Sequence, residues 1–220
     1  MRTLAAVPAK DLETAKQRLA RVLSPDERRA LAQSMLEDVL EALVAAGLDS
    51  VLVVTRDPEV MALARRFRAA ILEEAESRGH TEAVALAQRA AVEGGAAQLL
   101  TIPGDVPQMT PREIAALLEA APSAPGAVFV PSRSGFGTNG ALLSPPDVMA
   151  LKFGEPSFAN HLTAARRRGL DPVVLPLPGL GLDVDGPEDL RALLESERNT
   201  RSSRLLRTLG VAARLGALGP

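Results

Sequence analysis

The chain has 220 residues, of which 46% are hydrophobic and 24% charged, with a net charge of -2. This balance is typical of one globular domain and offers no basic footprint for nucleic acid. No apolar run approaches the ~18 residues of a membrane span, and no n-region and h-region open the chain, so we expect no signal peptide. The absence of cysteine excludes disulfides and thiol chemistry, and two histidines are too few for a multi-histidine zinc site. We therefore expect a cytoplasmic protein that binds neither nucleic acid nor membrane.

Apolar runs alternate with capped amphipathic segments along the first half of the chain. Ser24-Pro-Asp-Glu27 and Thr110-Pro-Arg-Glu113 are capping boxes, each with proline at the first helical position. Such alternation predicts an α/β fold whose parallel sheet lies between helices. Strands are expected at 3–9, 50–55, 69–72, 99–102, 126–131 and 173–175, and helices at 25–46, 58–68, 81–93, 111–121, 157–168 and 187–198. We expect one domain over 1–198 and a tail over 199–220 that is either a short helix or disordered.

Acidic residues follow strands at two distant places. Asp105 comes after an apolar strand and the turn residues Pro103 and Gly104, and Asp183 and Asp185 lie in a late turn. Ligands of open α/β sheets bind at the carboxyl ends of the strands. A lone aspartate is usually a turn former, but two acidic turns can share a hard cation such as Mg²⁺.

Basic residues are concentrated in the loop after the first strand. Lys10, Lys16 and Arg18 are expected at the same edge of the sheet as Asp105. Lysine and arginine donate to phosphate oxygens without needing deprotonation, so the loop suits a polyphosphate. A solvated basic loop is the simpler interpretation of these residues alone. The Gly-Lys-Ser/Thr of a P-loop is absent.

Two features of the second half suit an anion. Gly135-Phe-Gly-Thr-Asn-Gly140 spells a dinucleotide fingerprint, but the prolines that follow it exclude the required helix, so we interpret it as a turn between two strands. Backbone N–H groups of such a turn can bind an anion. Ser157 is the expected N-cap of a helix, whose N-terminus is a further anion site. His161 lies one turn into that helix and could face either way.

The ordered series of segments resembles one family. The matching pieces are Val7-Pro-Ala-Lys10, Ala15-Lys-Gln-Arg-Leu19, Leu23 to Leu31, Met35 to Leu40, Ile102-Pro-Gly-Asp-Val-Pro107, Gly137-Thr-Asn139, Phe153 to His161 and Leu180 to Leu190. Together they resemble the guanylyltransferases that activate 2-phospho-L-lactate or phosphoenolpyruvate in the biosynthesis of the deazaflavin coenzyme F(420). The resemblance spans nearly the whole chain.

The resemblance implies a fold, two substrates and a metal. The fold is the nucleotidyltransferase fold of glycosyltransferase-A-like type, a single α/β domain with a mixed, largely parallel sheet. The nucleotide donor is GTP, the acceptor a small phosphorylated carboxylic acid, and the metal Mg²⁺. A homodimer is a further possibility, because the segment around 131–146 could project as a hairpin.

The resemblance also assigns residues by position. Asp105, Asp183 and Asp185 would bind the metal, and Lys10 and Asp105 would be the catalytic pair. The nucleotide would be held by Lys10, Lys16, Arg18 and Gly79. The acceptor would be held by Thr138, Gly154 and Ser157.

One segment departs from the family pattern. Gly79-His-Thr-Glu-Ala83 stands where the family usually has Gly-Leu-Asn, so an asparagine with both a donor and an acceptor is lost. Two alternatives therefore stay open beside the guanylyltransferase. One is an enzyme of the same fold with another nucleotide or acceptor, of cytidylyl or sugar-phosphate type. The other is a non-catalytic nucleotide-binding protein.

Overall fold

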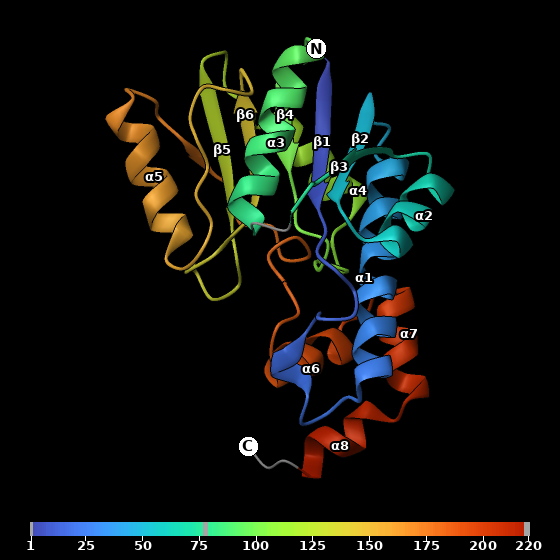
Figure 1. The fold of residues 1–220 in the computed structure, drawn as a ribbon. Helices are drawn as coiled ribbons and strands as arrows, with labels where there is room; N and C mark the ends of the chain where they lie inside the picture. Colours follow the sequence, from blue (N-terminus) through green and yellow to red (C-terminus); the bar gives the residue numbers. More distant parts are fainter. Residues whose placement is uncertain (1, 77–78, 218–220) are drawn as a thin grey trace.

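The molecule is built on a mixed sheet whose strand order is β3-β2-β1-β4-β6-β5-β7 (Figure 1). The structure is a computed structural model and describes residues 2–76 and 79–217. The strands are β1 (Thr3–Pro8), β2 (Ser50–Thr55), β3 (Ala70–Glu73), β4 (Gln98–Thr101), β5 (Gly126–Pro131), β6 (Thr138–Ser144) and β7 (Val173–Val174). The predicted α/β fold with a largely parallel sheet is confirmed.

The direction of β6 decides which residues reach the functional edge of the sheet. β1 pairs in parallel with both β2 and β4, whereas β6 runs antiparallel to its neighbours β4 and β5. The carboxyl ends of β1 and β4 therefore lie at the same edge as the first residue of β6, Thr138. Segments after β1 and β4 and the start of β6 are thus brought to one edge, although they are far apart in the sequence.

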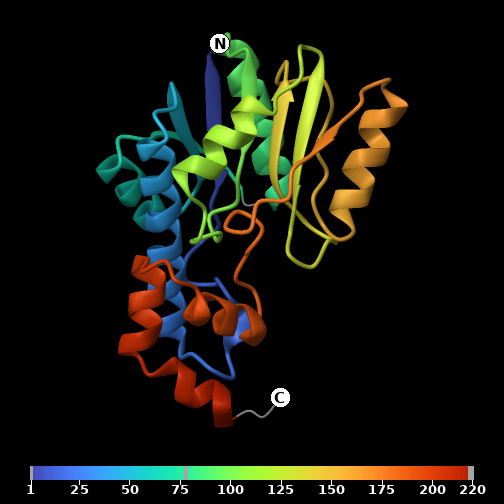
Figure 2. The same ribbon diagram turned by 180° about the vertical axis from the view of Figure 1, so that it is seen from behind.

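Helices cover both faces of the sheet. They are α1 (Pro25–Ala45), α2 (Pro58–Arg66), α3 (His80–Glu93), α4 (Pro111–Glu119), α5 (Ser157–Arg167), α6 (Pro187–Glu195), α7 (Arg201–Thr208) and α8 (Val211–Ala217), with a short 3-10 helix, η1 (Gln17–Leu19). Side chains alternate between the faces of β1: Ala5 and Val7 join the core under α1, α2 and α4, and Ala6 joins the core under α3. Figures 1 and 2 show these two helical layers from opposite sides.

A smaller lobe lies below the sheet and contains the C-terminal helices. Its core joins Leu19 of η1 and Leu31 and Met35 of α1 to Leu206 of α7 and Leu215 of α8. Residues 201–208 and 211–217 form the two helices α7 and α8, which pack in this core (Figure 2). The same core supports the loop that carries the basic residues.

Local helix signals agree with the structure except at one helix. The capping boxes at Ser24 and Thr110 are formed, and Asp57 caps α2. The predicted N-cap at Ser157 is wrong: Pro156 holds that position and Ser157 is the first helical residue. The Ser157 hydroxyl instead accepts a hydrogen bond from the Thr138 backbone N–H at 3.0 Å, because β6 lies directly beside it. Among the described residues, no helix combines the length and hydrophobicity needed to cross a bilayer.

Candidate active site

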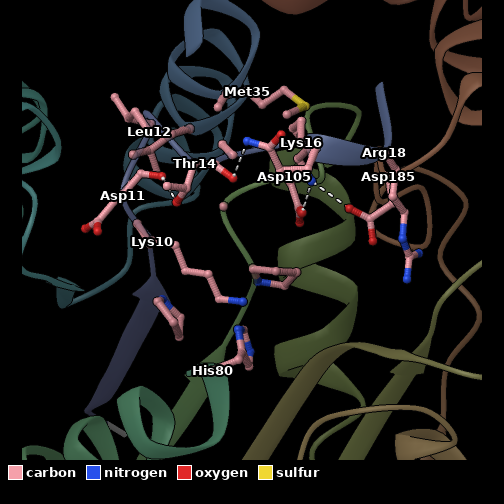
Figure 3. Close-up of a pocket in the computed structure, with 18 residues that line it drawn as sticks. Lys10, Asp11, Leu12, Thr14, Lys16, Arg18, Met35, His80, Asp105 and Asp185 are labelled. Carbon is pink, nitrogen blue, oxygen red and sulfur yellow. Dashed lines mark hydrogen bonds and ion pairs between the residues drawn. The ribbon is translucent and has the colours of Figure 1, made fainter. Parts of the chain in front are cut away.

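A pocket of about 420 Å³ opens at the carboxyl edge of the sheet (Figure 3). Its volume lies in the range of small-molecule sites. The loop after β1, the middle of α1, the turn after β4, the start of α3 and the late acidic turn all contribute to it. The polar side chains at its wall are Lys10, Asp11, Thr14, Lys16, Gln17, Arg18, His80, Asp105 and Asp185. The structure therefore brings together the predicted basic loop and two of the three predicted acids.

The Lys16 ammonium lies between two carboxylates at the floor of this pocket. Its Nζ donates to Asp105 Oδ2 at 2.5 Å and to Asp185 Oδ1 at 2.8 Å. The Lys16 side chain is only 9% exposed. Burial acts to lower its pKa, but the two carboxylates more than offset this, so the pKa of Lys16 stands above its usual range. Lys16 is fully charged at neutral pH.

The backbone at Lys16 is itself unusual. Its φ of 55° lies in the left-handed region, which a lysine adopts at a cost of about 1–3 kcal/mol. The two ion pairs and the hydrophobic contacts of the neighbouring Leu19 hold this conformation. A left-handed residue just before η1 turns the ammonium towards the sheet edge.

The two acidic turns are joined by their backbones. Val184 donates its N–H to the Asp105 carbonyl at 3.1 Å. The Asp185 and Gly186 N–H groups both donate to Asp189 Oδ2, at 3.0 and 2.8 Å. Asp189 thus fixes the turn before α6 from the first turn of that helix. Burial pushes the pKa of Asp185 upwards, but the Lys16 ammonium lowers it below its usual range, so this carboxylate stays ionised.

The other basic residues surround the pocket mouth. Lys10 and Arg18 are exposed, and Lys10 extends towards the imidazole of His80 (Figure 3). Burial lowers the pKa of His80 to about 4, so this ring is neutral at pH 7. Gly79 is the N-cap of α3 with a φ of 95°, and it adjoins the pocket through His80 without lining it. Three cationic groups and one neutral histidine therefore face the same space.

Asp183 stands apart from the other two acids. Its Oδ1 accepts from Asn139 Nδ2 at 3.0 Å, and the same amide reaches the Gly181 carbonyl at 3.0 Å. Burial raises the pKa of Asp183 against the effect of this amide. In the described ranges, no group of three or more His, Cys, Asp or Glu side chains could hold a metal ion.

The acids nevertheless fit the Mg²⁺ that the family resemblance implies. Asp105 and Asp185 already converge on one cation, the Lys16 ammonium. Mg²⁺ usually takes one or two protein carboxylates and completes its shell with water and phosphate oxygens. Two converging carboxylates beside a cationic loop match that requirement, whereas an all-protein site does not exist in the described part of the chain.

The three residues expected to hold the acceptor lie outside this pocket. Thr138 and Ser157 are joined by the bond from Thr138 N–H to Ser157 Oγ, and both are buried. Gly154 is exposed, and its φ of 108° favours glycine. Thr138 and Ser157 form a second polar cluster at the same sheet edge, and the buried His161 joins it to Lys152, in the loop that carries Gly154.

Several residues of the site have contacts that the sequence alone does not predict. Asp189 carried a signal, since Gly-Pro-Glu-Asp is a helix start whose third helical residue can reach back to the backbone before it. Asn139 belongs to the Gly137-Thr-Asn139 segment, but the sequence does not predict its contacts with Gly181 and Asp183. The contacts of His80 and His161 depend on strands and helices that only the fold brings together.

The fold of the chain is shared with solved structures. A crystal structure described as a nucleotide-diphospho-sugar transferase from Desulfovibrio desulfuricans G20 superposes with a TM-score of 0.79 and 18% identity, covering 99% of this chain and 98% of that one. At that identity the likeness establishes the fold alone. The chain has the nucleotidyltransferase fold.

The family follows from the sequence comparisons. The family model described as guanylyl transferase CofC like matches residues 3–216. A phosphoenolpyruvate guanylyltransferase of Rubrobacter xylanophilus is 45% identical, over 88% of this chain and 94% of that protein. A 2-phospho-L-lactate guanylyltransferase of Methanothermobacter thermautotrophicus is 36% identical, over 95% of this chain and 92% of that protein. The chain belongs to the CofC-like guanylyl transferase family.

Proposed function

We propose that the protein transfers GMP from GTP to phosphoenolpyruvate or 2-phospho-L-lactate and releases pyrophosphate, in the biosynthesis of coenzyme F(420). Relatives named for these two activities match nearly the full length of the chain. The single structural observation that carries the proposal is the Lys16 ammonium held between Asp105 and Asp185 in a pocket that Lys10 and Arg18 also line. Such a site can bind a triphosphate and a divalent cation together.

In the proposed reaction, a phosphate oxygen of the acceptor attacks the α-phosphorus of GTP. The bond from that phosphorus to the bridging oxygen breaks, and pyrophosphate leaves. The acceptor phosphate is already anionic at neutral pH, so no general base is required. The chain's task is to hold two anions together in line, which Lys10, Lys16 and Arg18 do by neutralising phosphate charge.

We propose that Asp105 and Asp185 hold Mg²⁺, with Asp183 as a third acid nearby. When bound, the ion supplies positive charge to the reacting phosphates. Thr138, Gly154 and Ser157 would receive the acceptor at the adjoining cluster, and Gly79 would lie beside the nucleotide. The neutral His80 occupies the segment that departs from the family pattern and lines the pocket.

A second candidate is transfer of another nucleotide by the same site. It is favoured by the Gly79–Ala83 segment, which lacks the family's asparagine. Pyrophosphate release measured with GTP, ATP, CTP and UTP, each with Mg²⁺ and each acceptor separately, decides between them. Release with GTP and one acceptor supports the guanylyltransferase. Release with ATP, CTP or UTP supports the second candidate, and no release with any pair contradicts both.

A further inference from the structure

A buried histidine ties together the two segments that carry the expected acceptor residues. His161 lies in α5 and is 1% exposed. Its Nδ1 lies 2.9 Å from Thr138 Oγ1, at the start of β6, and its Nε2 lies 3.0 Å from the backbone nitrogen of Lys152. The imidazole therefore contacts both Thr138 and the loop that carries Gly154.

The backbone bond fixes the protonation state of the ring. The Lys152 N–H can only donate, so His161 Nε2 must be the unprotonated acceptor. In the neutral ring the proton is then on Nδ1, which donates to the Thr138 hydroxyl oxygen. Burial lowers the pKa of His161 to about 4, which agrees with a neutral ring.

Two phenylalanines fix the plane of the ring. Phe129 of β5 stacks on it with centroids 5.5 Å apart and 13° between planes, and Phe153 packs edge-on with centroids 5.1 Å apart. The backbone N–H of Phe153 donates to Thr81 Oγ1 at 2.9 Å, which ties the same loop to α3. His161 thus cannot turn without displacing the loop that leads to Gly154.

The network leaves one hydroxyl proton for a ligand. The Ser157 hydroxyl accepts from the Thr138 N–H, and the two hydroxyl oxygens lie 3.4 Å apart. Thr138 Oγ1 also receives the Nδ1 proton of His161. Only one of the two hydroxyl protons can be donated to the other hydroxyl oxygen. Among the hydrogen bonds of the described residues, the remaining hydroxyl proton has no acceptor, so it can be donated to an anion.

We propose that His161 is a positioning residue of the acceptor site, which it serves in the neutral Nδ1–H form. It holds the Thr138 hydroxyl and the loop from Lys152 to Gly154 at a fixed separation, so that an anionic acceptor meets donors that are already in place. The inference rests on the proposed acceptor, a small phosphorylated carboxylic acid. The tautomer of His161 can be measured without any turnover.

The first experiment is long-range ¹H–¹⁵N correlation NMR on wild-type protein labelled at its histidines. The sequence has two histidines, and the spectrum of His80→Asn assigns the signals. At pH 7 we expect His161 to show an unprotonated Nε2 and a protonated Nδ1. An Nε2–H tautomer or a charged ring would overturn the inference, whatever the substrate of the protein.

The second experiment separates the two bonds by substitution. His161→Asn can still donate to Thr138 but does not reach Lys152, and His161→Gln can accept from Lys152 but loses the donor to Thr138. His161→Phe loses both and keeps the stacking. We expect the acceptor KM to rise about tenfold or more in His161→Phe and less in the other two, with the GTP KM within about twofold of wild type.

Ser202→Ala is the matched control, because this buried hydroxyl bonds to Asp38 Oδ2 at 2.6 Å, far from the acceptor cluster. We expect it to lower the melting temperature without changing the acceptor KM. An unchanged acceptor KM in all the folded His161 variants would refute the positioning role, as would equal rises in both KM values. Absence of wild-type turnover with GTP would instead refute the proposed function and with it the acceptor role, while leaving the NMR result standing.

Discussion

The Lys16 ammonium donates to the Asp105 carboxylate across 2.5 Å, although the two residues are 89 positions apart in the sequence. Lys16 follows β1 and Asp105 follows β4, and β1 and β4 are neighbours in the sheet. The same ammonium also bonds to Asp185. A single positive charge therefore occupies the point at which two carboxylates from distant segments converge, and we expect that charge to exchange with a divalent cation when nucleotide binds.

Replacement of Lys16 by methionine tests this exchange. The methionine retains the apolar stem but leaves Asp105 and Asp185 without their shared cation, so Mg²⁺ should bind more tightly in the absence of nucleotide. Turnover should fall by about 10²–10³-fold, because the Lys16 ammonium no longer neutralises charge on the triphosphate. Calorimetric titration with Mg²⁺ and pyrophosphate release measure the two effects. Weaker Mg²⁺ binding in the variant would contradict the exchange.

Asn139 should stabilise the late acidic turn. It is buried, and its amide donates to the Gly181 carbonyl and to Asp183. Asn139→Ala should lower the free energy of unfolding by about 1–3 kcal/mol and reduce turnover, because buried acceptors lose their donor. Asn139→Asp should lower the free energy of unfolding further, since a carboxylate then faces Asp183. Urea denaturation provides the comparison, and an aspartate variant as stable as wild type would rule out this role.

The C-terminal helices should depend on a single buried carboxylate. Asp38 of α1 accepts from the N–H groups of Arg201 and Ser202 and from the Ser202 hydroxyl. Asp38→Ala should lower the free energy of unfolding by about 2–4 kcal/mol, because these donors lose a charged acceptor. Asp38→Asn retains one acceptor oxygen, so its free energy of unfolding should lie between those of the wild type and Asp38→Ala. Equal stability of all three proteins in urea would show that the Asp38 carboxylate does not hold the C-terminal helices.

Acid should destabilise the fold through its histidines. The pKa values of His80 and His161 are about 4 in the folded protein, against about 6.5 when unfolded. Between these values the unfolded chain binds more protons, so stability is fully present above pH 6.5 and is lost as the pH falls towards 4. For the buried His161 each unit of difference corresponds to about 1.4 kcal/mol. Melting temperatures across this range should fall, and by less in His161→Phe.

The strands of the sheet and the positions of Asp105 and the basic loop could be predicted because short sequence patterns indicate them. Proline and glycine after an apolar run placed Asp105 at a strand end, and three basic residues in one loop indicated an anion site. The structure confirms the parallel half of the sheet through the pairing of β1 with β2 and β4.

The contacts of the second polar cluster could not be predicted. The residues of β6 do not indicate its direction in the sheet. Without that direction, the contacts between Thr138, Ser157 and His161 cannot be predicted. The same limit explains the wrong N-cap at Ser157. A serine before a helix usually caps it, but here the Ser157 hydroxyl accepts a hydrogen bond from a backbone N–H of the neighbouring strand. Packing of the last helices on Leu31 and Met35 likewise depends on tertiary structure.

Pyrophosphate release from GTP, compared between wild type and Asp105→Ala, tests most directly whether this pocket performs GMP transfer. Reactions should contain Mg²⁺ with either phosphoenolpyruvate or 2-phospho-L-lactate, and melting curves should confirm that the variant is folded. We expect acceptor-dependent release by the wild type and a loss of at least about 10²-fold in the variant. Release at the wild-type rate by folded Asp105→Ala would contradict the assignment of this pocket as the catalytic centre.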